Sequence, residues 1–495
     1  MRIYNKFSLV LILLVALASC DLDRFPHDKI DSGQAFQSIK DAENWNNGVY
    51  AFFRARQYGI FTYSQDVQAD QLNASLDFGN RNGELHRWTT FNAGSYTIRD
   101  TWYKYYTAIN NLNMILENYK TIQLEKDEDK ALLNRYTGDA YFARAYYYFE
   151  LAQRWSEAYD PATAATTLSV PIITTYDYTQ MPARSTLKDV YDLILSDLSQ
   201  AKTLLANIQG EKGAKKFTID AVVALEARVK INMKDWTGAY NAANSLITGG
   251  KYPLINNQTT FKQMWENDLG QEVILQLHVA KPDELANTNS IYLGYNAASN
   301  YYSPDFVPSQ WVVDMYDDND IRKNVYFDKK KVNLGGLDYN DIYLVNKYPG
   351  NPELFTAANT NYQHAPKVFR IAEMYLIAAE AASHSSASNA LIALNSLRQA
   401  RGLDALSNLS GVALTQAIKD ERFRELAFEG FRLFDLKRWG EGFERRDPQN
   451  ELMLSTGNDF INKRVGANDD KFVWGLPSND ITINPNLKDQ QNPGW

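Results

Sequence analysis

Long segments with helical hydrophobic periodicity constrain the fold of this 495-residue chain more than any other feature. Residues 98–119 place apolar and aromatic side chains at steps of three and four, and residues 131–155 do so with small residues between the rings. Residues 186–208 begin Thr-Leu-Lys-Asp, which predicts a capped helix start at Thr186. Because this spacing gives a helix one buried face, the sequence predicts a mainly α protein.

Two further segments predict helix pairs. In residues 218–249 a turn near Asp235 divides two helical stretches, and in residues 368–401 a Ser/Asn turn follows the first helix, which ends near His384. Small residues at regular offsets make both pairs resemble tetratricopeptide hairpins. The pairs do not recur at a fixed period of about 34 residues, so we expect a helical scaffold with insertions.

The insertions are expected at residues 60–97 and 251–366, which are rich in Asn, Asp, Gly, Pro, Ser and Tyr and show few helical repeats. Within the second, residues 272–279 predict a short strand and residues 289–311 a long loop that carries aromatic rings. Residues 441–495 are again irregular. Long loops in a compact protein usually serve binding or catalysis, so we expect the ligand site there.

The N-terminus combines a basic start, an apolar run over residues 7–18 and the only cysteine of the chain, Cys20. The run is too short to span a bilayer and suits the core of a signal peptide. Leu17-Ala18-Ser19-Cys20 resembles the lipobox of bacterial lipoproteins, which implies cleavage before Cys20 and acylation of its thiol. The alternative is an ordinary secretory signal with an incidental cysteine. A single cysteine excludes an intramolecular disulfide and a Cys-based zinc site.

Overall charge excludes one class of partner. The chain has 51 Lys and Arg against 59 Asp and Glu, a net charge of -8, and no basic run. Nucleic-acid affinity depends on phosphate neutralisation by cations, so we expect no nucleic-acid partner.

Residues 417–440 most resemble a catalytic element, since Glu421, Glu425 and Glu429 recur at four-residue steps. A carboxylate pair of this kind could act in a glycosidase. Flanking arginines lower carboxylate pKa values, which favours the alternative of a structural helix whose phenylalanines pack inward. There is no nucleophile elbow, phosphate-binding glycine loop or H-E-x-x-H motif, and the five histidines lack ligand spacing. We therefore predict no enzyme activity, metal or cofactor.

Four stretches together resemble the SusD/RagB family of outer-membrane lipoproteins. They are the lipobox with the following "DLDRFP", the pair "RIAEMYLIAAEAA" and "LNSLRQARGL", the block "DERFRELAFEGFRLFDLKRWG", and the ending "LPSNDITINPNLKDQQNPGW". The resemblance implies a mainly α fold in which tetratricopeptide-like helix pairs form a scaffold, while long irregular loops and a few short strands build the ligand site.

The same resemblance implies a non-catalytic protein, lipid-anchored in the outer membrane and facing the cell surface. It would capture oligosaccharides and deliver them to a SusC-type TonB-dependent transporter. A peptide-binding member of the family, a glycosidase and a protein-interaction scaffold are the alternatives. The implied organisation is a signal peptide at 1–19 and one domain at 20–495, with scaffold at 98–250 and 368–440, insertions at 60–97 and 251–366, and an irregular segment at 441–495.

A sugar has hydroxyls and an apolar face, so a site needs an exposed ring beside carboxylates or amides. The polar, ring-bearing insertions supply the candidates. They are Asp66, Asp70, Asn73, Asn80, Arg81, Trp88, Tyr301, Tyr302 and Trp311, with Arg370 at the start of a helix. Trp88 and Trp311 have an alternative role in pinning loops to the scaffold. We assign the rings at helical spacing, such as Trp102 and Tyr146 to Tyr148, to the core.

Overall fold

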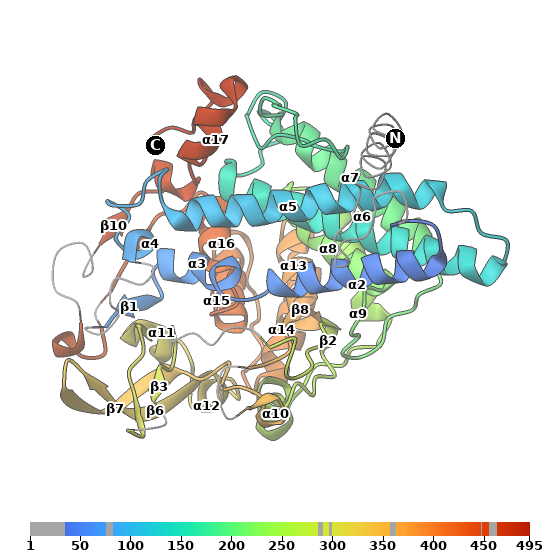
Figure 1. The fold of residues 1–495 in the computed structure, drawn as a ribbon. Helices are drawn as coiled ribbons and strands as arrows, with labels where there is room; N and C mark the ends of the chain where they lie inside the picture. Colours follow the sequence, from blue (N-terminus) through green and yellow to red (C-terminus); the bar gives the residue numbers. More distant parts are fainter. Residues whose placement is uncertain are drawn as a thin grey trace, which may run out of the picture.

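The computed structural model describes residues 35–75, 83–285, 291–296, 299–356, 363–446, 448–454 and 463–495. Three long helices, α2 (Ile39–Ala55), α5 (Tyr96–Asn118) and α6 (Asp127–Trp155), run side by side across the molecule (Figure 1). The strands within residues 295–345 lie on the opposite side of the molecule from these helices. The predicted mainly α fold is confirmed.

Helix α6 forms the centre of the core. The rings predicted to be internal are buried along it, and Trp102 of α5 packs against Trp155 at its end. Helix α7 (Leu187–Leu204) packs along α6, and its first turn is capped by Thr186 as predicted. A Cβ at Gly138 would lie 2.9 Å from the side chain of Leu205. The glycine therefore allows α6 and the end of α7 to approach closely.

The two predicted helix pairs are α8 (Ile219–Asn232) with α9 (Trp236–Thr248), and α13 (Ile371–Ser383) with α14 (Ala387–Ala400). Helix α9 packs against α13, so the pairs are neighbours although more than 100 residues separate them in the sequence. This stacking gives the scaffold its tetratricopeptide-like arrangement. The second pair begins later than predicted, because the residues before α13 form strand β8 (Lys367–Arg370).

The insertions contain more regular structure than we expected. Helix α3 (Ile60–Gln68) and strand β1 (Leu72–Ala74) lie in the first, and β6 (Phe327–Leu334) and β7 (Leu337–Val345) form an antiparallel hairpin in the second. The hairpin turns at Gly335-Gly336, both with positive φ, a two-residue signal present in the sequence. The predicted strand is confirmed as β2 (Val273–Gln276), which pairs with β8.

The remaining elements are short. They are α4 (Gly83–Arg87), α10 (Gln258–Glu266), β3 (Tyr295–Asn296), β4 (Tyr301–Tyr302), β5 (Phe306–Pro308), α11 (Gln310–Asp314), α12 (Lys323–Tyr326), β9 (Phe443–Glu444), β10 (Arg464–Val465) and α17 (Ser478–Ile483), with 3-10 turns at Tyr119–Thr121, Pro352–Leu354, Glu451–Met453, Asp470–Phe472 and Pro485–Leu487.

The acidic block predicted as one helical stretch is two helices, α15 (Gly411–Leu426) and α16 (Arg432–Trp439). The chain turns between them at Phe428 and Gly430, both with positive φ. A Cβ at Gly430 would lie 2.5 Å from the carbonyl oxygen of Thr62, so only glycine lets this turn pack against α3. Glu429 therefore lies outside the helix that carries Glu421 and Glu425.

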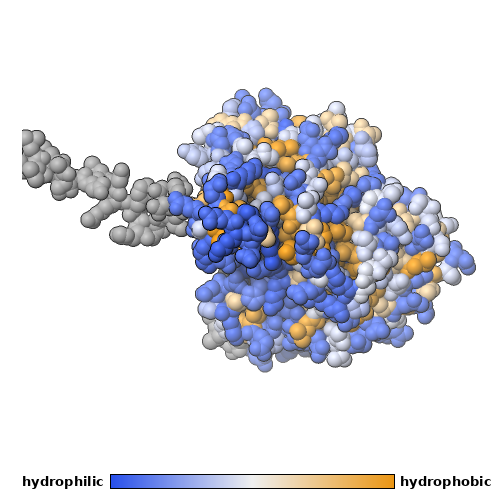
Figure 2. Space-filling view, turned by 90° about the vertical axis from the view of Figure 1, so that its right-hand side faces the viewer, coloured by the Kyte–Doolittle hydropathy of each residue, from blue (hydrophilic) through white to orange (hydrophobic). Residues whose placement is uncertain are grey.

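The surface of the scaffold is mixed. Figure 2 shows one side of the molecule, on which hydrophobic residues form patches between larger hydrophilic areas. Among the helices of the described segments, none combines the length and apolar character needed to cross a membrane.

Candidate functional site

The candidate site is a cavity of about 610 Å³, called the large cavity below, between α11, α15, α16 and the segment that follows α16. Strand pairing brings its walls together. Strand β1 pairs antiparallel with β5, with Leu72 opposite Pro308. Asp70 precedes β1 and Trp311 follows β5, so this register places the two residues beside each other. Both were predicted ligand residues, and both line the large cavity.

Helices α15 and α16 supply most of the remaining wall. Gln416, Asp420 and Phe423 recur at steps of four and three along α15, and therefore share one helix face. Helix α16 contributes Arg432 and Trp439 at a spacing of seven. The helix ends at Gly440 in the left-handed conformation, which turns the chain so that residues 441–444 return along the cavity.

Aromatic rings form a platform in the large cavity. The Trp311 ring stacks on Phe423, with ring centroids 5.1 Å apart and planes 25° apart. The guanidinium carbon of Arg446 lies 4.9 Å from the centre of the Trp311 ring. Trp439 is fixed by a 3.0 Å hydrogen bond from its Nε1 to Glu380, while Nε1 of Trp311 has no acceptor among the residues described. Trp311 is thus held by packing and keeps a free donor.

Two carboxylates of the large cavity, Asp70 and Glu441, are paired with cations of its own lining. Asp70 accepts two hydrogen bonds from Arg432, at 2.9 and 2.7 Å. Lys419 pairs with Glu441 at 2.5 Å. Burial alone would lower the pKa of Arg432, but the charge of Asp70 outweighs it and raises the pKa, so the cation is retained. This arrangement suits a ligand that is rich in hydroxyl groups and carries no negative charge.

The other carboxylates of the large cavity remain available as acceptors. Asp420 accepts a 2.8 Å bond from Gln416, and Asp314 accepts one of the same length from Gln310. Each carboxylate has two oxygens with about four acceptor positions, so one amide donor leaves most of them open. Sugar hydroxyls could use these positions.

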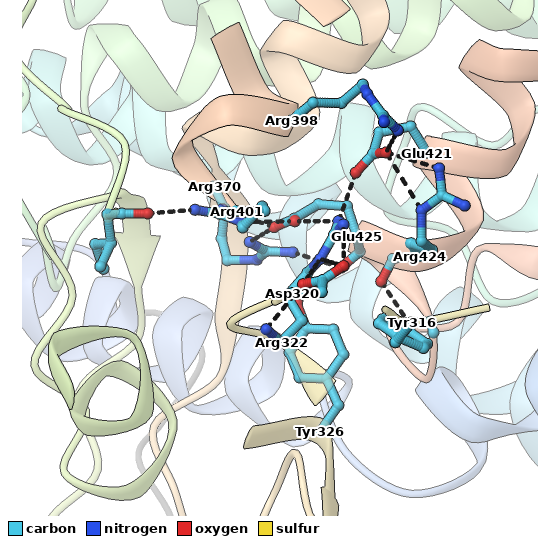
Figure 3. Close-up of polar contacts among 12 residues, drawn as sticks. Tyr316, Asp320, Arg322, Tyr326, Arg370, Arg398, Arg401, Glu421, Arg424 and Glu425 are labelled. Atoms are coloured by element: carbon cyan, nitrogen blue, oxygen red, sulfur yellow. Dashed lines mark hydrogen bonds and ion pairs between the residues drawn. The ribbon is translucent and has the colours of Figure 1, made fainter. Parts of the chain in front are cut away.

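The proposed carboxylate pair of a glycosidase lies elsewhere, in a buried ion network that we define by its centre at Glu425. Arg322, Arg370 and Arg401 converge on this carboxylate (Figure 3). The shortest of these bonds is 2.7 Å, from Arg370, and the Glu425 side chain is fully buried.

The electrostatics of this network oppose acid–base chemistry. Burial alone would raise the pKa of Glu421, but Arg322 and Arg424 outweigh it and lower the pKa to about 2. Burial alone would also raise the pKa of Glu425, but the charges of Arg401 and Arg370 outweigh it and hold the pKa well below its usual range. A general acid must keep its proton near neutral pH, which these carboxylates do not. Their geometry is that of a structural ion network that ties α15 to α14, β8 and β2.

Several predicted residues lie outside the large cavity. Arg370 does not face a cleft, because its guanidinium is buried against Glu425 and Glu429. Trp88 is buried against Phe443 and Phe472, and its Nε1 donates to the carbonyl of Gln68 at 2.7 Å. This position corresponds to the alternative role, in which Trp88 pins a loop to the scaffold.

Asp66 and Asn73 are also internal. Asn73 accepts a 2.6 Å hydrogen bond from Ser309. Asp66 lies beside Tyr292, whose hydroxyl donates at 3.3 Å, and Gly430, whose N–H donates at 3.1 Å. Burial raises the pKa of Asp66 to about 7, because these two donors offset desolvation only in part.

Tyr301 and Tyr302 are partly buried on β4, away from the large cavity, and the Tyr302 ring lies 5.0 Å from that of Tyr295. Three predicted positions, Cys20, Asn80 and Arg81, lie outside the described residues. Of the predicted ligand residues that the structure describes, only Asp70 and Trp311 lie together in the large cavity.

Sequence reasoning missed Gln416, Asp420, Arg432 and Trp439 as cavity residues and assigned Phe423 to inward packing. The four-residue spacing of Gln416 and Asp420, followed by Phe423, was a signal for a polar and aromatic face on one helix. Such a face indicates that α15 lines a cavity on one side, while Glu421 and Glu425 lie on its other side.

A second cavity, of about 140 Å³ and called the small cavity below, shares no lining residue with the large one. It lies between α3, α6, α8 and the turn before α16. Phe431 lines the small cavity and Arg432 the large one, so the start of α16 separates them. Within the described residues, no group of three or more His, Cys, Asp or Glu side chains is placed to hold a metal ion.

Comparison with known families gives two matches in this chain. Residues 323–495 match the model of the SusD family, and residues 22–231 match a model described as starch-binding and associating with the outer membrane. The matches cover helices α15 and α16 of the large cavity, while residues 232–322, which include α9 and Trp311, lie between the two matched segments.

Individual proteins agree with these matches. The chain is 23% identical to SusD-like protein P38 of Formosa agariphila, over 99% of each chain. A SusD superfamily protein from Bacteroides thetaiotaomicron shares the fold with a TM-score of 0.77 at 24% identity, over 92% of this chain and all of that one. A SusD-like carbohydrate-binding protein from Bacteroides vulgatus gives a TM-score of 0.72 at 20% identity, over 91% and 97% of the two chains.

Proposed function

The chain belongs to the SusD/RagB family, and from this membership we propose that it captures neutral glycan chains in the large cavity and delivers them to a SusC-type TonB-dependent outer-membrane transporter. The observation that carries the glycan part is the Trp311–Phe423 platform beside Asp70, whose charge Arg432 neutralises. A ring platform binds the apolar face of a sugar, and the surrounding acceptors bind its hydroxyls.

Size and charge support a glycan chain as the ligand. A volume of about 610 Å³ falls within the range of roughly 300–1,000 Å³ in which small-molecule sites usually lie. Asp70 and Glu441 are already paired with cations, while Asp314 and Asp420 bond only to amides, so the lining disfavours an acidic ligand and offers acceptors to hydroxyl groups.

Binding without catalysis is part of the proposal. The carboxylates that could act as a pair, Glu421 and Glu425, are buried and ionised among arginines. A glycosidase needs one protonated carboxyl group beside the scissile bond. We therefore assign these residues to the scaffold.

Anchoring is proposed from the sequence and from the family description, which associates its members with the outer membrane. Residues 1–19 would be a signal peptide, Cys20 the lipid-bearing N-terminus, and residues 20–495 one cell-surface domain. Membrane fractionation tests this anchor: a Cys20→Ala protein should leave the membrane fraction, and retention there would contradict lipid attachment.

Affinity electrophoresis tests glycan capture, with gels that contain starch, another neutral polysaccharide or an acidic polysaccharide. We expect retardation by at least one neutral polysaccharide. Trp311→Ala should weaken that binding about tenfold or more, which corresponds to ~1.4 kcal/mol. Tyr103→Ala is the control, because Tyr103 is an exposed ring on α5 outside the large cavity. Binding of peptides without any glycan would replace this proposal with the peptide-binding alternative.

A further inference from the structure

We propose that the small cavity is a second binding site, which takes one neutral sugar ring. Its volume of about 140 Å³ is close to that of the engineered cavity of about 150 Å³ that binds benzene. It therefore has room for a single six-membered ring and not for a chain. Tyr58, Tyr63 and Tyr348 line the small cavity and are only partly buried, which leaves an opening at this side.

Charge pairing favours a neutral ligand. Glu150 is bound by Arg154 at 2.6 Å, and Arg228 by Glu373 at 2.7 and 2.6 Å. Lys367 is paired with Asp268 at 2.8 Å. Glu429, also in the lining, is held by Arg370 and Lys347. A charged ligand would lose its hydration without finding an uncompensated partner, which is costly in a buried site.

Hydrogen-bonding capacity nevertheless remains. Gln57 is nine-tenths buried, and its Oε1 accepts a 3.1 Å bond from Tyr146, while its Nε2 has no acceptor among the residues described. Arg228 uses Nε and Nη2 in its bonds, and across the described segments Nη1 has none. The side-chain amide of Gln153 is likewise unbonded within the described part of the chain. An unpaired buried amide costs free energy, so a ligand that bonds to it gains that energy back.

Helix α6 brings three polar side chains to one wall of the small cavity. Tyr146, Glu150 and Gln153 lie at steps of four and three, so they share the helix face that lines the small cavity. They offer a hydroxyl, a carboxylate and an amide, which together donate and accept hydrogen bonds. A sugar ring, whose hydroxyls do both, is complementary to this face.

Aromatic rings close the rest of the small cavity. Phe61, Trp265, Tyr348, Phe428, Phe431 and Phe434 belong to its lining. The C–H face of a pyranose packs well against such rings, while its hydroxyl edge points to α6. The occupant is therefore a neutral pyranose, either a free monosaccharide or the terminal ring of a glycan.

Ligand-observed NMR on the full-length chain tests this site, with D-glucose, D-galactose and D-mannose as neutral probes and D-glucuronate and D-glucosamine as charged ones. We expect at least one neutral sugar to bind, and the charged ones to bind about tenfold more weakly or not at all. Gln57→Leu should weaken neutral binding about tenfold, ~1.4 kcal/mol. Gln153→Phe, which fills the cavity from a partly exposed position, should abolish it if the variant keeps the wild-type unfolding midpoint.

Trp311→Ala is the matched control, because that residue lines only the large cavity. It should weaken polysaccharide retardation and leave monosaccharide binding unchanged. The affinity for a neutral trisaccharide distinguishes the two sources of the ring. If Gln57→Leu lowers this affinity, the occupant is the terminal ring of a glycan; if the affinity is unchanged, the occupant is a free monosaccharide. No binding of any neutral monosaccharide, or binding lost in Trp311→Ala and kept in Gln57→Leu, would overturn the second site. Glycan capture by the large cavity would then still stand on its own test.

Discussion

The buried ion network and the large cavity both contain acidic and basic side chains, and both include residues of helix α15. They differ in the burial and the partners of their carboxylates. Glu421 and Glu425 on one face are fully buried among arginines. Gln416 and Asp420 on another face border open space beside rings. Burial and partner geometry therefore decide whether a carboxylate holds the fold together or remains available to a ligand.

The largest expected effect comes from breaking the network at its centre. Glu425→Gln would leave Arg322, Arg370 and Arg401 buried with too little negative charge. We expect a loss of about 3–5 kcal/mol in the free energy of unfolding, measured by urea denaturation at pH 7. Asp420→Asn, on the cavity face of the same helix, is the control and should change stability by less than about 0.5 kcal/mol. A loss below ~1 kcal/mol for Glu425→Gln would show that the network does not hold these elements together.

Asp66 is as buried as Glu425 but has no arginine partner within the described residues. Burial raises its pKa from 3.8 to about 7, and the nearby Lys347 offsets this only in part. A raised folded-state pKa gives stability that is complete below pH 3.8 and is lost as the pH rises toward 7.

Asp66→Asn should remove this pH dependence. Relative to the variant, the wild-type free energy of unfolding should fall by on the order of 4 kcal/mol between pH 4 and pH 8, since one pKa unit corresponds to ~1.36 kcal/mol. Urea denaturation across this range measures the difference. Val67→Ala is the control, because a lost apolar contact should lower stability equally at every pH. A constant difference between wild type and Asp66→Asn would mean that the carboxyl group is ionised throughout.

Much of the scaffold was predictable from the sequence. The spacing of rings and small residues located α5 and α6, and the cap at Thr186 and the turn near Asp235 located helix starts, because these signals are local in the chain. Helix α3 was missed because most of its nine residues are polar or aromatic and its N-cap is Gly59, which has no capping side chain. Its stability comes from tertiary packing, which local patterns do not report.

The candidate site was less predictable for the same reason. Asp70 and Trp311 are 241 positions apart, and only the register of β1 against β5 brings them together. Asp66 and Asp70 look alike in the sequence, yet one is internal and the other borders the large cavity. Arg370 looked available at a helix start, and its burial depends on Glu425 and Glu429, more than 50 residues away.

A smaller effect is expected for the Asp70–Arg432 pair in the wall of the large cavity. Asp70→Asn leaves Arg432 without its bidentate partner, and we expect a loss of about 1–2 kcal/mol in unfolding free energy. The variant should also gain affinity for an acidic polysaccharide in electrophoresis, because the free guanidinium then attracts carboxylates. Asp314→Asn, which removes an unpaired carboxylate from the same cavity, controls for the change in net charge. Unchanged selectivity in Asp70→Asn would contradict the assignment of this pair to ligand discrimination.

The smallest effect is expected at the rim of the large cavity. Lys419 and Glu441 form a 2.5 Å pair, but their side chains are 17% and 41% exposed. Solvent screens such a pair, so a double-mutant cycle with Lys419→Met and Glu441→Gln should give a coupling of roughly 0–1 kcal/mol that declines with added salt. The equivalent cycle on Arg401 and Glu425 should give a larger coupling that salt does not reduce, because that pair is fully buried. If the two cycles gave similar couplings with the same salt dependence, burial would not be what distinguishes the scaffold face of α15 from its ligand face.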